Sequence, residues 1–244
     1  MTDLSIDLEP PRRALAVAAH PDDVEFGCGA TLAKWAAAGT EEHLLVLTDG
    51  SKGTWETGAD TAALVETRHE EQRRAAKTLG IEEVRFLDFV DGELRNGRDE
   101  QAAVCEVIRD TRPDVVLGHD PWKRYRLHPD HRHAGHLTID AIVAARDPHF
   151  FADRGESFRP ACLLLFEAEE VDHVEDATGW LGMKVDALLC HRTQWRSTMK
   201  IEAGSASEDG QRAAFAIRVR AEAGEAGAIA GYALGEGFKR MEPL

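Results

Sequence analysis

Two short clusters in this sequence combine histidine with aspartate, a pairing that suits binding of a divalent metal ion. Residues 20–23 read HPDD, and residues 128–131 read HPDH. Two imidazoles and one carboxylate fit Zn²⁺ or another first-row divalent metal, and they leave a fourth coordination position open. Zn²⁺ lowers the pKa of water at such a position to about 7, and a further carboxylate nearby can act as a general base. The HPDD cluster offers one aspartate for each task.

Each cluster also has an ordinary structural interpretation. Proline fixes φ and aspartate can cap a following helix, so HPDD could be a simple turn at the end of a strand. A histidine-rich loop on the surface is usually only solvated. A site is favoured because both clusters follow apolar runs and because five of the eleven histidines lie between His119 and His136.

The elements around the clusters predict how the two could meet. The apolar run 14–19 is expected to be a buried parallel strand that ends at HPDD, and residues 114–118 are expected to be the fourth strand, before HPDH. Further strands are expected at 44–47, 84–87 and 161–168, with helices at 27–38, 61–79, 100–109, 131–145, 180–194 and 208–225. This alternation predicts an α/β fold, a Rossmann-like and mostly parallel sheet with helices on both faces. Because ligands bind at the carboxyl ends of such strands, we expect the metal site there.

The length and charge of the chain limit its organisation and its partners. The 244 residues, 43% of them hydrophobic, suffice for one sizeable core. Residues 1–13 are expected to be a flexible N-terminal tail, and residues 14–244 a single domain. The net charge of −15 disfavours nucleic acid and anionic membranes as partners.

The sequence also bears on the compartment. Its apolar runs are far shorter than the ~18 residues that span a membrane, and the first thirteen residues contain no apolar leader. The four cysteines are scattered without a CxxC motif, as expected for reduced thiols. These features predict a cytoplasmic protein.

Together the clusters and several other segments resemble the PIG-L/LmbE-like family of N-acetylglucosaminyl deacetylases. The resemblance is carried by HPDDVEFGCGATL (20–32), RHEEQRRAAKTLG (68–80), DGEL (91–94), HPDH (128–131) and ALLCHRTQW (187–195), in the family's order. It covers most of the chain. One departure is visible, because the family's downstream motif is usually H-x-S-Q and Thr193 here replaces the serine while keeping a hydroxyl.

The resemblance implies roles for the HPDD cluster. His20 and Asp23 would bind the metal together with His131, and Asp22 would be the general base. Spacing alone does not choose between His131 and His133 as the third ligand, whereas the family pattern favours His131.

It also implies roles for three further residues. His128, as an imidazolium, would stabilise the oxyanion, and Asp130 would orient it. Arg68 would reach acyl or sugar oxygens of the substrate, although a helix face with Glu70 and Glu71 would accommodate it equally well as an ordinary surface residue.

The implied function is zinc-dependent removal of an N-acyl group from an N-acetylglucosamine-type small molecule or glycoconjugate. A homo-oligomer, an amidase for a sugar–thiol or antibiotic conjugate and a non-catalytic relative all stay open. From another class, a dinucleotide-binding module would use Gly27, Gly29 and Asp49, but Leu32 stands where the third glycine belongs.

Overall fold

The computed structural model describes residues 4–244 and contains one eight-stranded sheet with the strand order β1-β7-β8-β6-β5-β2-β3-β4. The strands are β1 (Ser5–Ile6), β2 (Arg13–Ala18), β3 (Glu41–Thr48), β4 (Glu83–Phe89), β5 (Val115–His119), β6 (Cys162–Phe166), β7 (His173–Asp176) and β8 (Gly235–Met241). Only the pairs that β8 makes with β6 and β7 are antiparallel. The predicted mostly parallel α/β sheet is confirmed.

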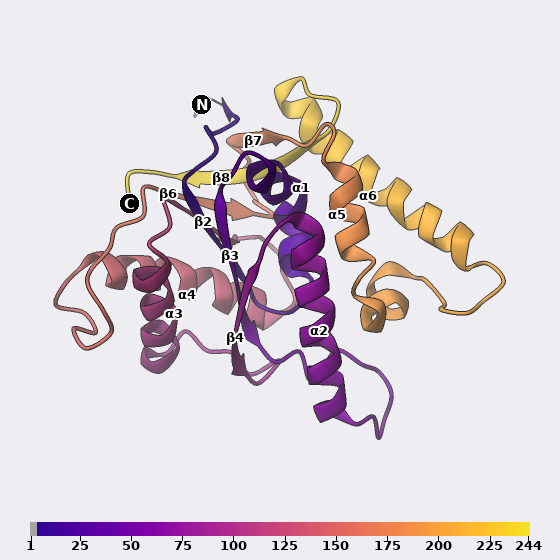
Figure 1. Ribbon diagram of the computed structural model, residues 1–244, viewed down its shortest axis with the longest axis horizontal. Coiled ribbons are helices and arrows are strands. Elements are labelled where there is room, and N and C mark those ends of the chain that lie inside the picture. The colour runs from indigo at the N-terminus through magenta and orange to yellow at the C-terminus, as the bar shows by residue number, and fades with distance from the viewer. Residues whose placement is uncertain (1–3) are drawn as a thin grey trace.

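Helices cover both faces of this sheet (Figure 1). They are α1 (Asp23–Ala37), α2 (Thr61–Leu79), α3 (Arg98–Thr111), α4 (Pro129–Arg146), α5 (Leu181–Leu188) and α6 (Glu208–Ala230). One apolar core lies between the sheet and α1, α2 and α5, and a second core lies between the sheet and α3 and α4. Since β2 contributes alternate residues to both cores, it is buried along almost its whole length, as its apolar run predicts.

The residues considered for dinucleotide binding have other tasks. A Cβ atom at Gly27 would overlap the Phe166 ring, so this glycine allows α1 to pack closely on the sheet. The Asp49 carboxylate accepts the backbone N–H groups of Ser51 and Asp91, 2.9 and 3.0 Å away, and thereby orders the turn after β3. Neither residue is arranged to hold a cofactor.

Part of the segment expected to be a flexible tail contacts the sheet and α1. Ser5–Ile6 pair with β7, and the Ser5 hydroxyl lies 2.8 Å from Nδ1 of His173. Lys34 on α1 adds an ion pair with Asp7 at 2.8 Å. The composition of this segment alone does not predict such long-range contacts. Residues 1–3 of the expected tail lie outside the described residues.

Two other expectations for the second half of the chain also fail. The helix expected at 180–194 ends at Leu188, and a 3₁₀ turn (Arg192–Gln194) and a π turn (Trp195–Met199) follow it. Strand β8 was not expected because its sequence, GEGFKRM, is poor in strand-forming residues. A Cβ atom at Gly235 would meet the Gly227 Cα atom of α6 at 2.8 Å, so close packing of α6 requires glycine here. Among residues 4–244, no helix combines the length and apolar character of a membrane span.

Candidate metal centre and active site

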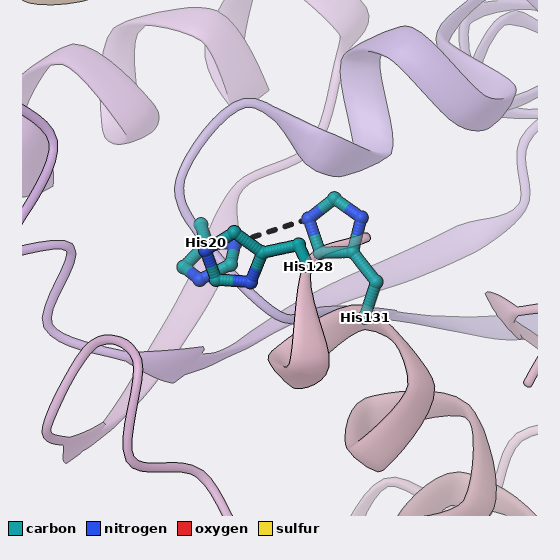
Figure 2. A group of neighbouring side chains, drawn as sticks. All are labelled: His20, His128 and His131. Carbon is teal, nitrogen blue, oxygen red and sulfur yellow. Dashed lines mark hydrogen bonds between the residues drawn. The ribbon is translucent and has the colours of Figure 1, made fainter. Parts of the chain in front are cut away.

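The fold brings the two histidine–aspartate clusters together, as the sequence predicts. β2 and β5 are neighbours, so the turn after β2 faces the N-terminus of α4, which follows β5. Figure 2 shows His20, His128 and His131 grouped at this edge. The His20 Nδ1 and His131 Nε2 atoms are 3.2 Å apart. His133 instead bonds to the Leu94 carbonyl, outside the cluster, so of these two candidates for the third ligand it is His131 that lies against His20.

His20, Asp23 and His131 fit a zinc ion by the spacing of their donor atoms. Nδ1 of His20 lies 3.4 Å from Oδ2 of Asp23, and Nε2 of His131 lies 3.3 Å from Oδ1 of the same carboxylate. Ligand atoms roughly 2.0–2.1 Å from a tetrahedral zinc ion are themselves roughly 3.3 Å apart. The 3.2 Å between the two histidine nitrogens matches this value, and each nitrogen lies 3.3–3.4 Å from a different oxygen of Asp23, so a cation among them would meet both imidazoles and the carboxylate.

The opposite ring nitrogen of His20 is held by two carboxylates. Its Nε2 atom is 3.1 Å from Oδ2 of Asp130 and 3.2 Å from Oδ1 of Asp91. A proton on Nε2 leaves the Nδ1 lone pair free for a metal, the usual arrangement of a carboxylate–histidine–metal triad. Asp91 belongs to the DGEL segment of the family resemblance, and the sequence analysis assigned it no role in the site. Its position after β4, at the same edge of the sheet, is the signal that could have identified it.

Charge around His20 also favours a cation. Burial lowers the pKa of His20, but hydrogen bonds to Asp130, Asp23 and Asp91 outweigh it and hold the pKa well above its usual value. Three buried carboxylates therefore share one imidazolium when no metal is bound. A divalent ion supplies the same positive charge and displaces a proton on binding.

Asp130 has a different partner from the one expected. Its buried carboxylate contacts His20 and accepts the Gly92 N–H at 2.7 Å. Toward His128 it contributes only its backbone N–H, which donates to Nδ1 of His128 at 3.3 Å. Asp130 thus orients a predicted metal ligand, whereas the sequence analysis expected it to orient the oxyanion histidine.

His119 is a further residue that the sequence analysis did not assign. It is the last residue of β5 and fully buried, with Nε2 3.2 Å from Oδ2 of Asp23. Its ring stacks on that of His131, with centroids 4.5 Å apart. His119, Asp23 and His131 form a second group of closely spaced donor atoms, so His119 either orients Asp23 or joins the ligands.

The backbone of Asp22 adopts a strained left-handed conformation that α2 holds in place. Its φ of 99° and ψ of −21° are unusual for a residue other than glycine. The Asp22 N–H donates to Oε1 of Gln72 at 3.0 Å, and Nε2 of Gln72 donates to Glu25 at 2.5 Å. One turn earlier on α2, Arg68 donates to the Pro21 carbonyl at 2.7 Å. Glu25 fixes the orientation of the Gln72 amide, which in turn fixes Asp22.

The Asp22 carboxylate has the properties of a general base near neutral pH. Burial raises its pKa to about 6, against the opposing influence of Arg68 and His191. A side chain of this pKa can accept a proton at neutral pH and still return it. The nearest guanidinium nitrogen of Arg68 is 3.8 Å away.

His128 lies at the mouth of the site as the N-cap of α4. Because its Nδ1 accepts the Asp130 N–H, Nε2 carries the proton of the neutral ring. Burial, and then the neighbouring His20 and His131, lower the pKa of His128. A neutral hydrogen-bond donor is therefore favoured over the imidazolium that the sequence analysis expected.

Arg68 and the HRTQ segment hold the loops of the site. Arg68 is 3% exposed, and its guanidinium donates to the carbonyls of Gly50 and Pro21 while bordering the cavity. The Thr193 hydroxyl donates to Glu71 at 2.6 Å, a hydrogen bond that a serine hydroxyl at this position could also make. Arg68 is thus as much a loop-positioning residue as the substrate-binding residue that was expected.

The two clusters border one cavity of about 640 Å³, a size typical of small-molecule sites. Besides His20, Asp22, Asp23, His128 and His131, it is lined by charged and polar side chains that include Lys52, Arg68, Asp91, Glu167, Gln194 and Glu222. The cavity can therefore hold a polar molecule against the clustered histidines and aspartates.

Comparison with known proteins identifies the family. The model of the PIG-L family, described as GlcNAc-PI de-N-acetylase, matches residues 15–142. This stretch includes both clusters and the strands that position them. The chain belongs to the PIG-L family.

Individual relatives support two kinds of chemistry on this fold. The chain is 42% identical over 139 residues to diacetylchitobiose deacetylase of Thermococcus kodakarensis, a match covering 57% of this chain and 52% of that one, so it spans about half the length of this curated relative. The N,N'-diacetylchitobiose deacetylase of Pyrococcus horikoshii superposes with a TM-score of 0.83 and 27% identity, over 95% of this chain and 84% of that chain. GalB, the 4-carboxy-2-hydroxymuconate hydratase of Pseudomonas putida KT2440, gives 0.76 and 25%, over 96% and 97%.

Proposed function

We propose that this protein is a zinc-dependent hydrolase that removes the N-acetyl group from an N-acetylglucosamine-type substrate. Membership of the PIG-L family and the 42% identity to a diacetylchitobiose deacetylase support the reaction. The fold alone does not choose it, because a hydratase shares the same architecture.

One observation carries the proposal. The imidazole nitrogens of His20 and His131 lie 3.2 Å apart, each lies 3.3–3.4 Å from one oxygen of Asp23, and the Asp22 carboxylate borders the same cavity without belonging to that set. A metal site with a separate carboxylate beside it is an arrangement that can hydrolyse an amide.

The residues divide the work as follows. His20, Asp23 and His131 would hold a zinc ion, which would supply Lewis acidity toward the carbonyl and make water more acidic. Asp22 takes the proton of the attacking water on its carboxylate. His128 donates a hydrogen bond from Nε2 to the oxyanion as it forms, and Asp22 returns its proton to the leaving amine.

The other polar groups of the cavity position the substrate. Lys52, Arg68 and Gln194 line the cavity in which the substrate would lie. The Lys52 ammonium is a donor that suits the hydroxyl and acyl oxygens of an amino sugar. Other first-row divalent metals also suit the same donor set.

Amine release from a panel of N-acyl compounds tests the proposal. The panel contains N-acetylglucosamine, N,N'-diacetylchitobiose, an N-acetylglucosaminyl inositol and an N-acylated thiol conjugate, each offered to zinc-loaded protein. We expect release from the amino sugars and none from the thiol conjugate. Hydrolysis of only the thiol conjugate would move the assignment to that class of amidase, and no hydrolysis by zinc-loaded protein would overturn it.

A further inference from the structure

A second cavity adjoins the candidate active site. It measures about 590 Å³ and is lined by Trp55, Glu56, Thr193, Arg196 and Ser197, among others. The two cavities share Gly53, and consecutive residues of the HRTQ segment divide between them, since Gln194 borders the first and Thr193 the second. The two cavities therefore lie next to each other, on either side of Gly53 and the HRTQ segment.

The second cavity is lined by one large apolar side chain, and most of that side chain is exposed to solvent. Trp55 is 90% exposed, whereas Trp35 and Trp195 are buried in the cores. Packing within the protein therefore does not account for the tryptophan at this position. An indole ring offers a flat apolar face of the kind that stacks against the C–H face of a sugar.

The remaining lining is polar and carries both charges. Glu56 and Ser197 offer acceptors, and Arg196 and Ser197 offer donors, around the single aromatic ring. Binding sites that combine an apolar face with a few polar groups suit a ring rich in hydroxyls. A purely apolar ligand would leave these groups without partners.

The segment between the two cavities is held by hydrogen bonds, although the Trp55 side chain is exposed. Nε2 of Gln194 donates to the Gly53 carbonyl at 3.0 Å, and the N–H of Lys52 donates to Asp91 at 3.0 Å. Asp91 also contacts the predicted metal ligand His20. The distance from the metal centre to the second cavity is thus fixed by bonded neighbours.

We propose that the cavity around Trp55 is a second sugar subsite, which binds the pyranose ring next to the one whose N-acetyl group is hydrolysed. The occupant is the adjoining ring of a short N-acetylglucosamine oligosaccharide, stacked on Trp55 and bonded to Arg196 and Glu56. This subsite rests on the proposed function and names the substrate class for it.

Kinetics on one-ring and two-ring substrates test the subsite. Trp55→Ala should raise KM for N,N'-diacetylchitobiose about three- to tenfold and leave kcat for it, and both constants for N-acetylglucosamine, unchanged. Trp55→Phe keeps an aromatic face and should recover most of the affinity. Trp122→Ala is the matched control, because Trp122 is another exposed tryptophan (57%) that packs on His136 and borders neither cavity. Equal effects of Trp55→Ala on both sugars, or none on the disaccharide, would overturn the subsite.

Binding without turnover separates the subsite from the proposed function. N,N'-diacetylchitobiose is titrated calorimetrically into chelated wild-type protein and into its Trp55→Ala variant. If the wild type binds the disaccharide through Trp55 but hydrolyses no amino sugar, the function fails and the subsite stands. If it hydrolyses both sugars and Trp55→Ala binds the disaccharide like wild type, the subsite fails and the function stands. Neither binding nor hydrolysis by the wild type would overturn both.

Discussion

The two clusters begin with the same tripeptide, His-Pro-Asp, yet its members take different positions in the site. In the first cluster His20 and Asp22 are both buried (7% and 8% exposed) and both border the cavity, His20 against the carboxylates of Asp130 and Asp91 and Asp22 as the candidate base. In the second cluster Asp130 is fully buried against His20, and His128 is the exposed residue at the mouth of the cavity. The same tripeptide therefore has different roles in the two clusters.

The point at which each helix begins explains this difference. α1 starts with Asp23, so the third residue of its motif, Asp22, is the N-cap and takes the strained left-handed conformation. α4 starts with Pro129, so the first residue of its motif, His128, is the N-cap. The helix start is thus shifted by two motif positions, and corresponding side chains of the two motifs have different surroundings. The backbone around a motif therefore decides which of its residues does the chemistry.

Asp22→Asn should have the largest effect, because it removes the base and keeps the shape. We expect kcat to fall about 10³-fold while the protein still binds one zinc ion. The measurement is acetate release together with metal content by elemental analysis. Asp23→Asn is the control that should lose metal. If Asp22→Asn lost its zinc as well, the division of roles between the two aspartates would be wrong.

His128→Asn separates the chemical role of the second N-cap from its structural one. Asparagine caps helices well, so α4 should keep its stability, while kcat should fall about 10²-fold with the loss of the oxyanion donor. His128→Ala should lose similar activity and also about 1 kcal/mol of stability. Thermal melts and steady-state kinetics check both variants. Full activity in His128→Asn would remove His128 from the mechanism.

Asp130→Asn should weaken metal binding more than it affects the base. Because Asp130 holds Nε2 of His20, we expect zinc affinity to fall by about 10–100-fold. Competition with a chromophoric chelator measures this affinity, and saturating zinc should restore most of kcat. If affinity stayed the same and kcat fell, Asp130 would act on His128, as the sequence analysis expected.

Gln72→Leu should give the smallest effect on the first cluster. It removes the acceptor of the Asp22 N–H without adding a charge, so the candidate base should shift slightly. We expect kcat to fall about tenfold with an unchanged KM and unchanged zinc affinity. Gln101→Leu on α3, far from the cavity, is the control. A loss of zinc in Gln72→Leu would show that the contact supports Asp23 instead.

Much of the fold and the location of the site could be predicted from the sequence. The apolar runs that became β2 and β5 are continuous, and the carboxyl ends of neighbouring parallel strands must lie together, so the meeting of HPDD with HPDH follows. Strand β8 could not be predicted in this way, because its glycines are required by close approaches, of α6 to Gly235 and of Val171 to Gly237, that the local pattern does not show.

The contacts within the site were harder to predict than its position. That Asp130 turns to His20, and that His119 and Asp91 join the cluster, depends on side-chain directions set by three different strands and two helix starts. Spacing along the chain carries no such information. The strained Asp22 is equally a product of contacts, because Gln72 lies fifty residues away in sequence.

Acetate release from N,N'-diacetylchitobiose by one protein sample, before chelation, after EDTA and after zinc is returned, tests the assignment of a metal-dependent deacetylase most directly. We predict release before chelation, its loss with EDTA and its recovery with about one equivalent of zinc per chain. Release that survives complete removal of metal, or no release from the zinc-loaded protein, would contradict the assignment.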